Sequence, residues 1–238
     1  MGEFNVEERA RLSAGESAAV IHAAVLAACI ERGVHAQCLL DVGCGTGSLR
    51  ARVQTCCERY IGADAIRHHG FPADAEFVLA NLDAGNVALP DGTCDVVACV
   101  ETIEHVENPR ALMRELVRLT RPGGWLIVTT PNQLSVLSKL TLLTKNEFTH
   151  FQERPGLYPA HISALLEVDL IRMCRENALE DLAVRYSGRG RIPFTARDWP
   201  YPLRAGSGAR GRAFSDNILV VARKPVTASL ATSDLPSN

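Results

Sequence analysis

Short apolar runs recur along the chain and alternate with segments that have helical spacing. The runs have the length that is typical of buried strands. They cover residues 38–42, 60–64, 77–81, 94–100 and 124–130. Helices are predicted for residues 16–32, for residues 48–58 and within residues 107–124, which end in a Pro-Gly-Gly breaker. Because parallel strands need crossover connections, this alternation predicts a mostly parallel sheet that helices cover on both faces.

Two later apolar runs, residues 182–186 and 217–225, would complete the sheet. The last run follows a long loop rich in glycine, proline and arginine without an obvious crossover helix, which indicates an antiparallel strand at the sheet edge. We therefore expect an α/β fold with a doubly wound, Rossmann-like, seven-stranded sheet, mostly parallel with an antiparallel edge strand. The expected organisation is one domain over residues 1–225, insertions near 133–160 and 187–215, and a disordered polar tail at 226–238.

The composition is that of a globular protein with a sizeable core. Of the 238 residues 47% are hydrophobic and 22% are charged, and the formal net charge of -2 gives no overall field to attract nucleic acid or an anionic membrane. The eight cysteines lie mostly in apolar segments, with no secretory signal ahead of them. The longest apolar run, residues 18–30, is too short to span a membrane. These features predict buried thiols, a cytoplasmic location and no membrane span.

Three glycines, Gly43, Gly45 and Gly47, follow the first apolar run in the stretch LLDVGCGTGSL. Ligands of open α/β sheets bind outside the carboxyl ends of the strands, so this turn would let a nucleoside-bearing ligand approach the backbone closely. Asp64 ends the next run and can accept hydrogen bonds from both ribose hydroxyls. The dinucleotide fingerprint requires a glycine at position 48, where this chain has Ser48, so the spacing disfavours a nicotinamide or flavin site.

Asp41 lies inside the first strand, where a carboxylate is an awkward neighbour for pyrophosphate but can hold an ammonium group. Asp41 and the glycines form one motif, and the chain resembles the class I S-adenosylmethionine-dependent methyltransferases from about residue 39 to residue 132. The resemblance continues more weakly to residue 225. The matching motifs are LLDVGCGTG, IGAD, ANLDAGNVALPDGTCDVVACVETIEHV and LTRPGGWLIVTTPN, in the family's order.

The resemblance implies that S-adenosylmethionine is the cofactor. The residues expected to bind it are Asp41, Gly43, Cys44, Gly45, Gly47, Asp64, Ala65, Asn81, Leu82, Cys99 and Val100. The family often has an acidic residue at the place of Asn81, where it touches the adenine amine. Either the Asn81 side chain or the backbone of Leu82 is expected to accept that hydrogen bond here.

A second cluster, Glu101, Glu104 and His105, follows the fourth strand at i, i+3 and i+4. On a helix these positions share one face, so their side chains could hold a divalent cation such as magnesium, with His161 as a fourth ligand. The segment CVETIEHV resembles the ubiquinone-biosynthesis O-methyltransferases and the small-RNA terminal 2′-O-methyltransferases, in which these residues are associated with a metal beside the acceptor hydroxyl. In relatives without a metal, the glutamates instead complement a helix N-terminus and the histidine packs.

These four residues are also the candidate catalytic residues, because a base assists the attack of a hydroxyl oxygen. We expect transfer of a methyl group from S-adenosylmethionine to a small-molecule acceptor. The expected acceptor atom is a hydroxyl oxygen of a phenol, a sugar or a lipid-linked intermediate. An RNA 2′-O-methyltransferase and a cofactor-binding scaffold without catalysis are the alternatives. The low net charge disfavours a nucleic-acid partner without excluding one.

Two segments outside the shared core are expected to choose the acceptor. Residues 133–148 carry a helical stripe of leucines, which favours core packing over a lid or a membrane contact. Residues 185–212 carry seven arginines with interleaved aromatic residues. That segment is either a solvated loop or a binding surface for phosphate and bases.

Overall fold

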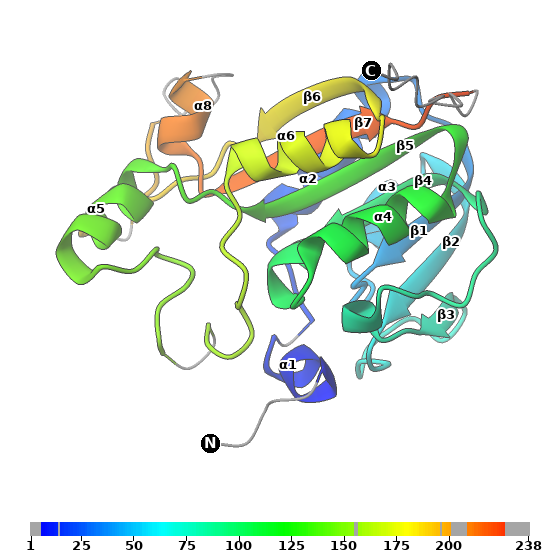
Figure 1. Ribbon diagram of the computed structural model, residues 1–238, viewed down its shortest axis with the longest axis horizontal. Helices are drawn as coiled ribbons and strands as arrows, with labels where there is room; N and C mark the ends of the chain where they lie inside the picture. Colours follow the sequence, from blue (N-terminus) through cyan, green and yellow to red (C-terminus); the bar gives the residue numbers. More distant parts are fainter. Residues whose placement is uncertain (1–5, 14, 155–156, 196, 201–208, 227–238) are drawn as a thin grey trace, which may run out of the picture.

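A seven-stranded mixed sheet forms the centre of the computed structural model, which describes residues 6–13, 15–154, 157–195, 197–200 and 209–226 (Figure 1). Its strands are β1 (Ala36–Val42), β2 (Cys57–Asp64), β3 (Glu76–Leu79), β4 (Cys94–Val100), β5 (Thr120–Pro131), β6 (Glu180–Tyr186) and β7 (Asn217–Arg223). The strand order is β3-β2-β1-β4-β5-β7-β6, and β7 alone runs antiparallel to the other six strands. The expected doubly wound, mostly parallel sheet is therefore confirmed, with the antiparallel strand inserted beside the edge strand β6.

Helices cover both faces of the sheet. The described helices are α1 (Val6–Leu12), α2 (Ala19–Glu31), α3 (Arg50–Val53), α4 (Pro109–Leu119), α5 (Val136–Lys145), α6 (Glu167–Glu176) and α8 (Ala209–Phe214), with the short 3-10 helices η1 (Leu82–Ala84) and η2 (Ile103–His105). In Figure 1, α4 and α6 lie in front of the sheet and α2 lies behind it. None of the described helices is long and apolar enough to cross a membrane.

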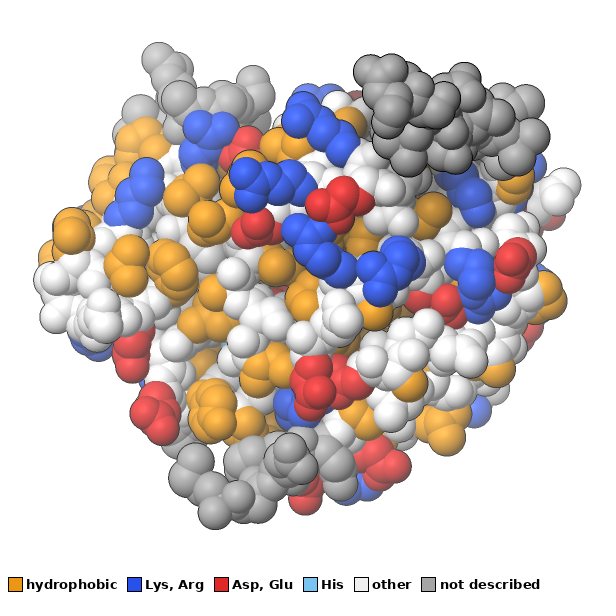
Figure 2. Space-filling view, viewed as in Figure 1, with side chains coloured by type: hydrophobic (Ala, Val, Ile, Leu, Met, Phe, Trp, Pro, Cys, Tyr) orange, Lys and Arg blue, Asp and Glu red, His pale blue; other side chains and the backbone are white. Residues whose placement is uncertain are grey.

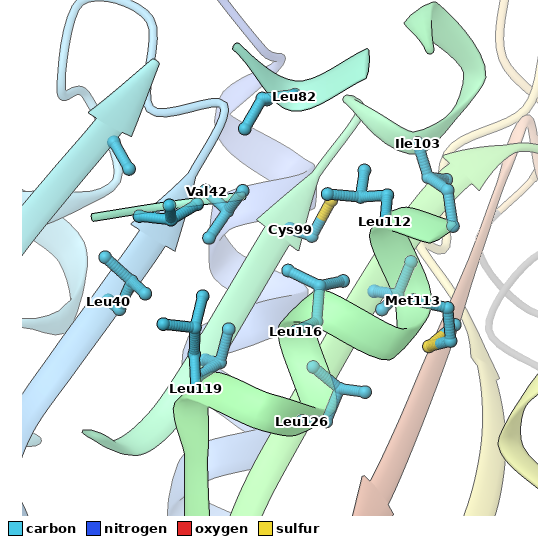
Figure 3. Packing of buried hydrophobic residues seen from close by; sticks show 14 of the residues in the cluster. Leu40, Val42, Leu82, Cys99, Ile103, Leu112, Met113, Leu116, Leu119 and Leu126 are labelled. Carbon is cyan, nitrogen blue, oxygen red and sulfur yellow. The ribbon is translucent and has the colours of Figure 1, made fainter. Parts of the chain in front are cut away.

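Alternating side chains of the central strands supply the two cores. Leu40 and Val97 pack with α4 and α6, whereas their neighbours Leu39 and Val96 pack with α2 and α3. Figure 3 shows the first of these cores, where Leu112 and its neighbours on α4 meet the strands. Because both faces of each central strand are buried, these strands read as nearly continuous apolar runs, which explains why the sequence locates them.

Three local predictions fail. The helix expected at residues 48–58 shrinks to α3, because β2 already begins at Cys57. The segment that contains Glu101 and Glu104 forms a 3-10 turn rather than an α-helix. The stripe on α5 does not pack into the core, since Ser138 is its only buried residue and Leu143 is 81% exposed. In Figure 1 α5 stands away from the sheet, at the left.

All eight cysteines are free, and all but the partly exposed Cys57 are buried, as expected for small apolar residues. Of the tail expected to be disordered, residues 227–238 lie outside the described residues.

Candidate cofactor and acceptor site

A cavity of about 380 Å³ opens at the carboxyl ends of β1, β2 and β4. Its size lies within the range of ordinary small-molecule sites. Strand ends, the N-terminal segment and the start of β7 all contribute to its wall. Of the residues predicted from the sequence, Asp41, Gly43, Cys44, Asp64, Ala65, Leu82, Val100, Glu101, His105 and His161 line it.

The glycine loop after β1 is shaped by contacts within the protein. All three of its glycines have positive φ, and a Cβ on Gly43 would meet Thr102 Oγ1 at 2.1 Å. A Cβ on Gly45 would meet the carbonyl oxygen of Gly15 at 2.0 Å, and one on Gly47 would meet Pro72 at 2.8 Å. Gly43 borders the cavity, but Gly45 and Gly47 do not. Neighbouring protein atoms therefore exclude a side chain at each of these three positions.

Asp64 stands at the end of β2, where its carboxylate organises the glycine loop. Its Oδ2 accepts a hydrogen bond of 2.8 Å from Gly45 N, and its Oδ1 accepts one of 2.6 Å from Ala65 N. Burial raises the pKa of Asp64, and these backbone donors oppose the shift. Each carboxylate oxygen has a second lone pair, so the group can still accept hydrogen bonds from a ligand in the cavity.

Asp41 is a buried carboxyl whose hydrogen bonding is incomplete. Its Oδ2 accepts a hydrogen bond of 2.6 Å from the Tyr60 hydroxyl, while its buried Oδ1 has no partner among the described residues. Burial raises the pKa of Asp41 to about 7, although the bond from Tyr60 lowers it. An unpaired carboxylate oxygen at a cavity wall suits a cationic group such as an ammonium.

Besides Gly45 and Gly47, the predicted cofactor contacts Cys99 and Asn81 are not among the lining residues. The side chain of Cys99 points into the hydrophobic cluster that Figure 3 shows, because alternate residues of β4 face opposite sides of the sheet. That side chain therefore does not line the cavity. Asn81 Oδ1 accepts hydrogen bonds from the backbone N–H groups of Asp83 and Ala84, so it caps η1. Leu82, next to it, does line the cavity.

An N-terminal strap, made of α1 and residues 13 and 15–18, covers the cofactor end of the cavity. Thr46 N donates a hydrogen bond of 2.9 Å to the carbonyl oxygen of Gly15, which joins the strap to the glycine loop. Arg9, on α1, is buried and forms ion pairs with Asp83 and with Glu107. The residues of this segment that line the cavity include Val6, Arg9, Ala10, Ser13, Gly15, Glu16, Ser17 and Ala18. Sequence reasoning missed the strap because its residues form no recognisable motif.

Glu101 borders the other end of the cavity. It follows β4 in the left-handed backbone region, with φ 49°. Its Oε1 accepts a hydrogen bond of 2.9 Å from Thr129 Oγ1, and its Oε2 accepts one of 2.7 Å from Asn217 Nδ2. Burial raises the pKa of Glu101 to about 7, while both of these hydrogen bonds lower it.

Glu104 lies behind the cavity wall and is fully buried. Its Oε2 accepts a hydrogen bond of 3.1 Å from Thr130 Oγ1, whereas its Oε1 has no partner among the described residues. Burial, and then the charge of Glu101, raises the pKa of Glu104 well above its ordinary value. Such an orphaned buried oxygen calls for an explanation, and a bound ion is one.

The two histidines of the cluster are held in defined tautomers. His105 Nδ1 donates to the carbonyl oxygen of Ala160 at 2.8 Å, and His161 Nδ1 donates to that of His150 at 2.7 Å. A carbonyl oxygen only accepts, so in each neutral ring the proton is on Nδ1 and the lone pair is on Nε2. Burial lowers the pKa of His105 to about 4 and also lowers that of His161, so both rings are neutral at pH 7.

Glu104, His105 and His161 each offer one ligand atom, and these atoms lie within 4.8 Å of one another. Glu101, the other expected ligand, is outside this group, and its carboxylate accepts hydrogen bonds from Thr129 and Asn217. Neutral imidazoles whose second nitrogen donates to a carbonyl oxygen are typical metal ligands. Two imidazoles and one carboxylate favour a transition metal over the expected magnesium, which prefers oxygen ligands.

Sequence reasoning also missed part of the acceptor end. His150, Arg189, Arg191, Asp216 and Asn217 line it. The two arginines come from the arginine-rich segment that the sequence had marked out. His150 and Asn217 carried no signal, because only the fold brings them beside Glu101 and His161.

The fold is shared with solved methyltransferase structures. A SAM-dependent methyltransferase of Thermotoga maritima, described as a possible histamine N-methyltransferase, matches with a TM-score of 0.61 at 16% identity, over 86% of this chain and 92% of that one. A SAM-dependent methyltransferase of Archaeoglobus fulgidus matches with a TM-score of 0.59 at 16% identity, over 85% and 94%. These likenesses establish the class of fold.

The family follows from the sequence comparisons. Residues 7–184 match the family model described as a methyltransferase domain, and the chain belongs to that family. A ubiquinone biosynthesis O-methyltransferase of Thiobacillus denitrificans is 31% identical over 153 residues, which cover 60% of this chain and 64% of the relative. One of Bordetella bronchiseptica is 31% identical over 103 residues, covering 40% and 43%. The chain thus spans less than two thirds of the length of these relatives.

Proposed function

We propose that the protein transfers a methyl group from S-adenosylmethionine to a hydroxyl oxygen of a small-molecule acceptor. The observation that carries this proposal is one cavity with Asp41 and Asp64 near one end and Glu101, His105 and His161 at the other. Membership of the methyltransferase-domain family supports the cofactor. The relatives named O-methyltransferases support oxygen as the acceptor atom.

Residues at the cofactor end fit S-adenosylmethionine by their chemistry. The unpaired Oδ1 of Asp41 would accept a hydrogen bond from the ammonium group, and Asp64 would accept hydrogen bonds from the ribose hydroxyls. The strap, with Gly15 bonded to Thr46, would exclude water from the bound cofactor. When bound, S-adenosylmethionine supplies a methyl group on a positively charged sulfur, and that sulfur leaves as a neutral thioether.

The acceptor end supplies positioning and a base. The Nε2 lone pair of His105 or His161 can accept the proton of the acceptor hydroxyl, since both rings are neutral. Glu101, with a pKa of about 7, is the other candidate base. Such a base contributes about 10²- to 10⁴-fold in rate. Alignment of the reacting groups contributes roughly 7 to 11 kcal/mol of barrier reduction.

A divalent cation held by Glu104, His105 and His161 would provide a second way to activate the hydroxyl. It would lower the pKa of an acceptor oxygen next to it. The orphaned Oε1 of Glu104 and the two Nε2 lone pairs are the atoms that would bind it. Manganese or zinc fits this ligand set better than magnesium.

Metal removal tests this part of the proposal. If a cation activates the acceptor, EDTA should lower the turnover of a catechol acceptor by about 100-fold or more, and manganese or zinc should restore it. Glu104→Gln should reproduce the loss, because it replaces one ligand oxygen by an amide nitrogen. S-adenosylhomocysteine formation and the O-methyl product are measured by mass spectrometry.

The exposed Glu153→Gln change, in the same acceptor-side region, is the matched control. Full activity in EDTA would rule out the cation and leave the histidines or Glu101 as the base. Formation of S-adenosylhomocysteine without any O-methyl product would contradict the proposed acceptor atom.

RNA is the less favoured acceptor. The net charge is -2, and on the face that Figure 2 shows, basic and acidic side chains are interspersed rather than gathered into a basic tract. Nucleic-acid binding usually requires such a tract. Hydrophobic side chains gather at the left of the same view, over α5.

A further inference from the structure

Two arginines, Arg189 and Arg191, line the acceptor end of the cavity. Their backbone is pressed against the segment that leads into β7. Asp216 N donates a hydrogen bond of 2.6 Å to the carbonyl oxygen of Arg189. Between them, a Cβ on Gly190 would meet the carbonyl oxygen of Phe214 at 2.0 Å. These contacts fix where the two arginine side chains begin.

The two arginines make few ionic contacts within this wall. Asp216 is the nearest carboxylate, and its Oδ2 lies 3.7 Å from Arg191 Nε, which is beyond a direct hydrogen bond. Arg189 forms no ion pair with any other described residue within the salt-bridge distance. Glu101, the other carboxyl at this end, accepts its hydrogen bonds from Thr129 and Asn217, so neither arginine has a directly hydrogen-bonded carboxylate among the described residues.

The arginines are also close to the reactive end. Asn217, next to Asp216 in the chain, donates a hydrogen bond of 2.7 Å to Glu101 Oε2. His150 lines the cavity together with Arg191, and its ring stacks 6.5 Å from that of His161. One small molecule can therefore reach both the arginines and the candidate bases.

We propose that the acceptor is an anion, a small hydroxylated molecule whose carboxylate or phosphate group binds Arg189 and Arg191. Its hydroxyl would then lie against Glu101 and His161. A guanidinium group matches such an oxyanion because it donates two parallel hydrogen bonds. This proposal rests on the proposed function and adds the chemical class of the acceptor.

Equilibrium titrations of the full chain, saturated with S-adenosylhomocysteine, test it. The ligands are 3,4-dihydroxybenzoate, its neutral counterpart catechol, and inorganic phosphate. We expect 3,4-dihydroxybenzoate to bind about 10-fold tighter than catechol or more, and Arg189→Gln or Arg191→Gln to weaken it by about 10- to 100-fold. Catechol should bind all variants alike. Arg197→Gln, an exposed change in the same segment outside the cavity wall, is the matched control.

The result for inorganic phosphate separates the two sources of the oxyanion. If phosphate binds in an Arg189- and Arg191-dependent manner while 3,4-dihydroxybenzoate binds no better than catechol, the site takes a phosphorylated acceptor. If neither anion binds, or if both bind the variants and wild type alike, the proposal is overturned. Binding of S-adenosylhomocysteine is measured first. A wild-type protein that does not bind it would contradict the proposed function and not the proposal about the acceptor.

Discussion

Asp41 and Glu104 are buried carboxyls, at different places around the same cavity, and each has one oxygen without a hydrogen-bond partner in the described part of the chain. A buried carboxyl without a full set of partners costs stability, so each of these oxygens calls for an explanation such as a bound ligand. The sequence already marked Asp41 as an acid inside a strand and Glu104 through its spacing with Glu101 and His105. It could not show which carboxylates stay unpaired. That depends on contacts such as the hydrogen bonds from Tyr60 to Asp41 and from Asn217 to Glu101.

At the residue scale, Asp41→Asn should change how stability depends on pH. Burial raises the pKa of Asp41 from 3.8 to about 7, so its protonated form favours the folded state. The contribution of protonated Asp41 to folding stability is full below pH 3.8 and is lost as the pH rises through 7. The asparagine has no such loss. In the absence of cofactor, the free energy of unfolding of the variant should rise relative to that of wild type by up to about 1.4 kcal/mol per pH unit between pH 4 and pH 7.

Urea unfolding at four pH values across this window measures the difference. The exposed Glu58→Gln change serves as a control for removal of a surface charge. A difference between Asp41→Asn and wild type that stays constant with pH would show that Asp41 keeps an ordinary pKa.

At the scale of elements, the strands were predictable and the connections were not. The prediction for β4 is exact, and the predictions for β2 and β5 are short only at their ends, because parallel strands buried on both faces are apolar throughout. The lengths of the helices predicted around α3 and η2 were overestimated, since local spacing does not reveal where the next strand or a left-handed residue stops a helix. Helix α5 was misassigned to the core, because a leucine stripe does not show what covers it.

The strap was absent from the sequence prediction and has the clearest consequence at this scale. Arg9→Gln should release α1 from Asp83 and Glu107 and raise the Kd for S-adenosylhomocysteine about 10-fold, as expected for loss of a buried charged contact. The exposed Arg11→Gln change, on the same helix, removes a contact with Glu7 alone among the described ion pairs. It should leave the Kd unchanged. Calorimetric titration compares the two, and equal Kd values would show that the strap does not hold the cofactor.

At the scale of the molecule, the sheet brings together parts of the chain that are far apart in sequence. The cofactor end is built mainly by β1, β2 and the strap, and the acceptor end by the segments after β4, before α6 and around the start of β7. The family resemblance located the first end, because its motifs are contiguous. The second end was only partly predictable, since its residues come from several insertions. The central claim is that this one cavity binds S-adenosylmethionine.

Isothermal titration of the full chain with S-adenosylhomocysteine and, separately, with NAD is the most direct test of that claim. The account predicts one S-adenosylhomocysteine site per chain, no binding of NAD, and a loss of about 1 to 3 kcal/mol in binding free energy for Asp64→Ala. Absence of S-adenosylhomocysteine binding, tighter binding of NAD, or an unchanged affinity of the Asp64→Ala protein would contradict it.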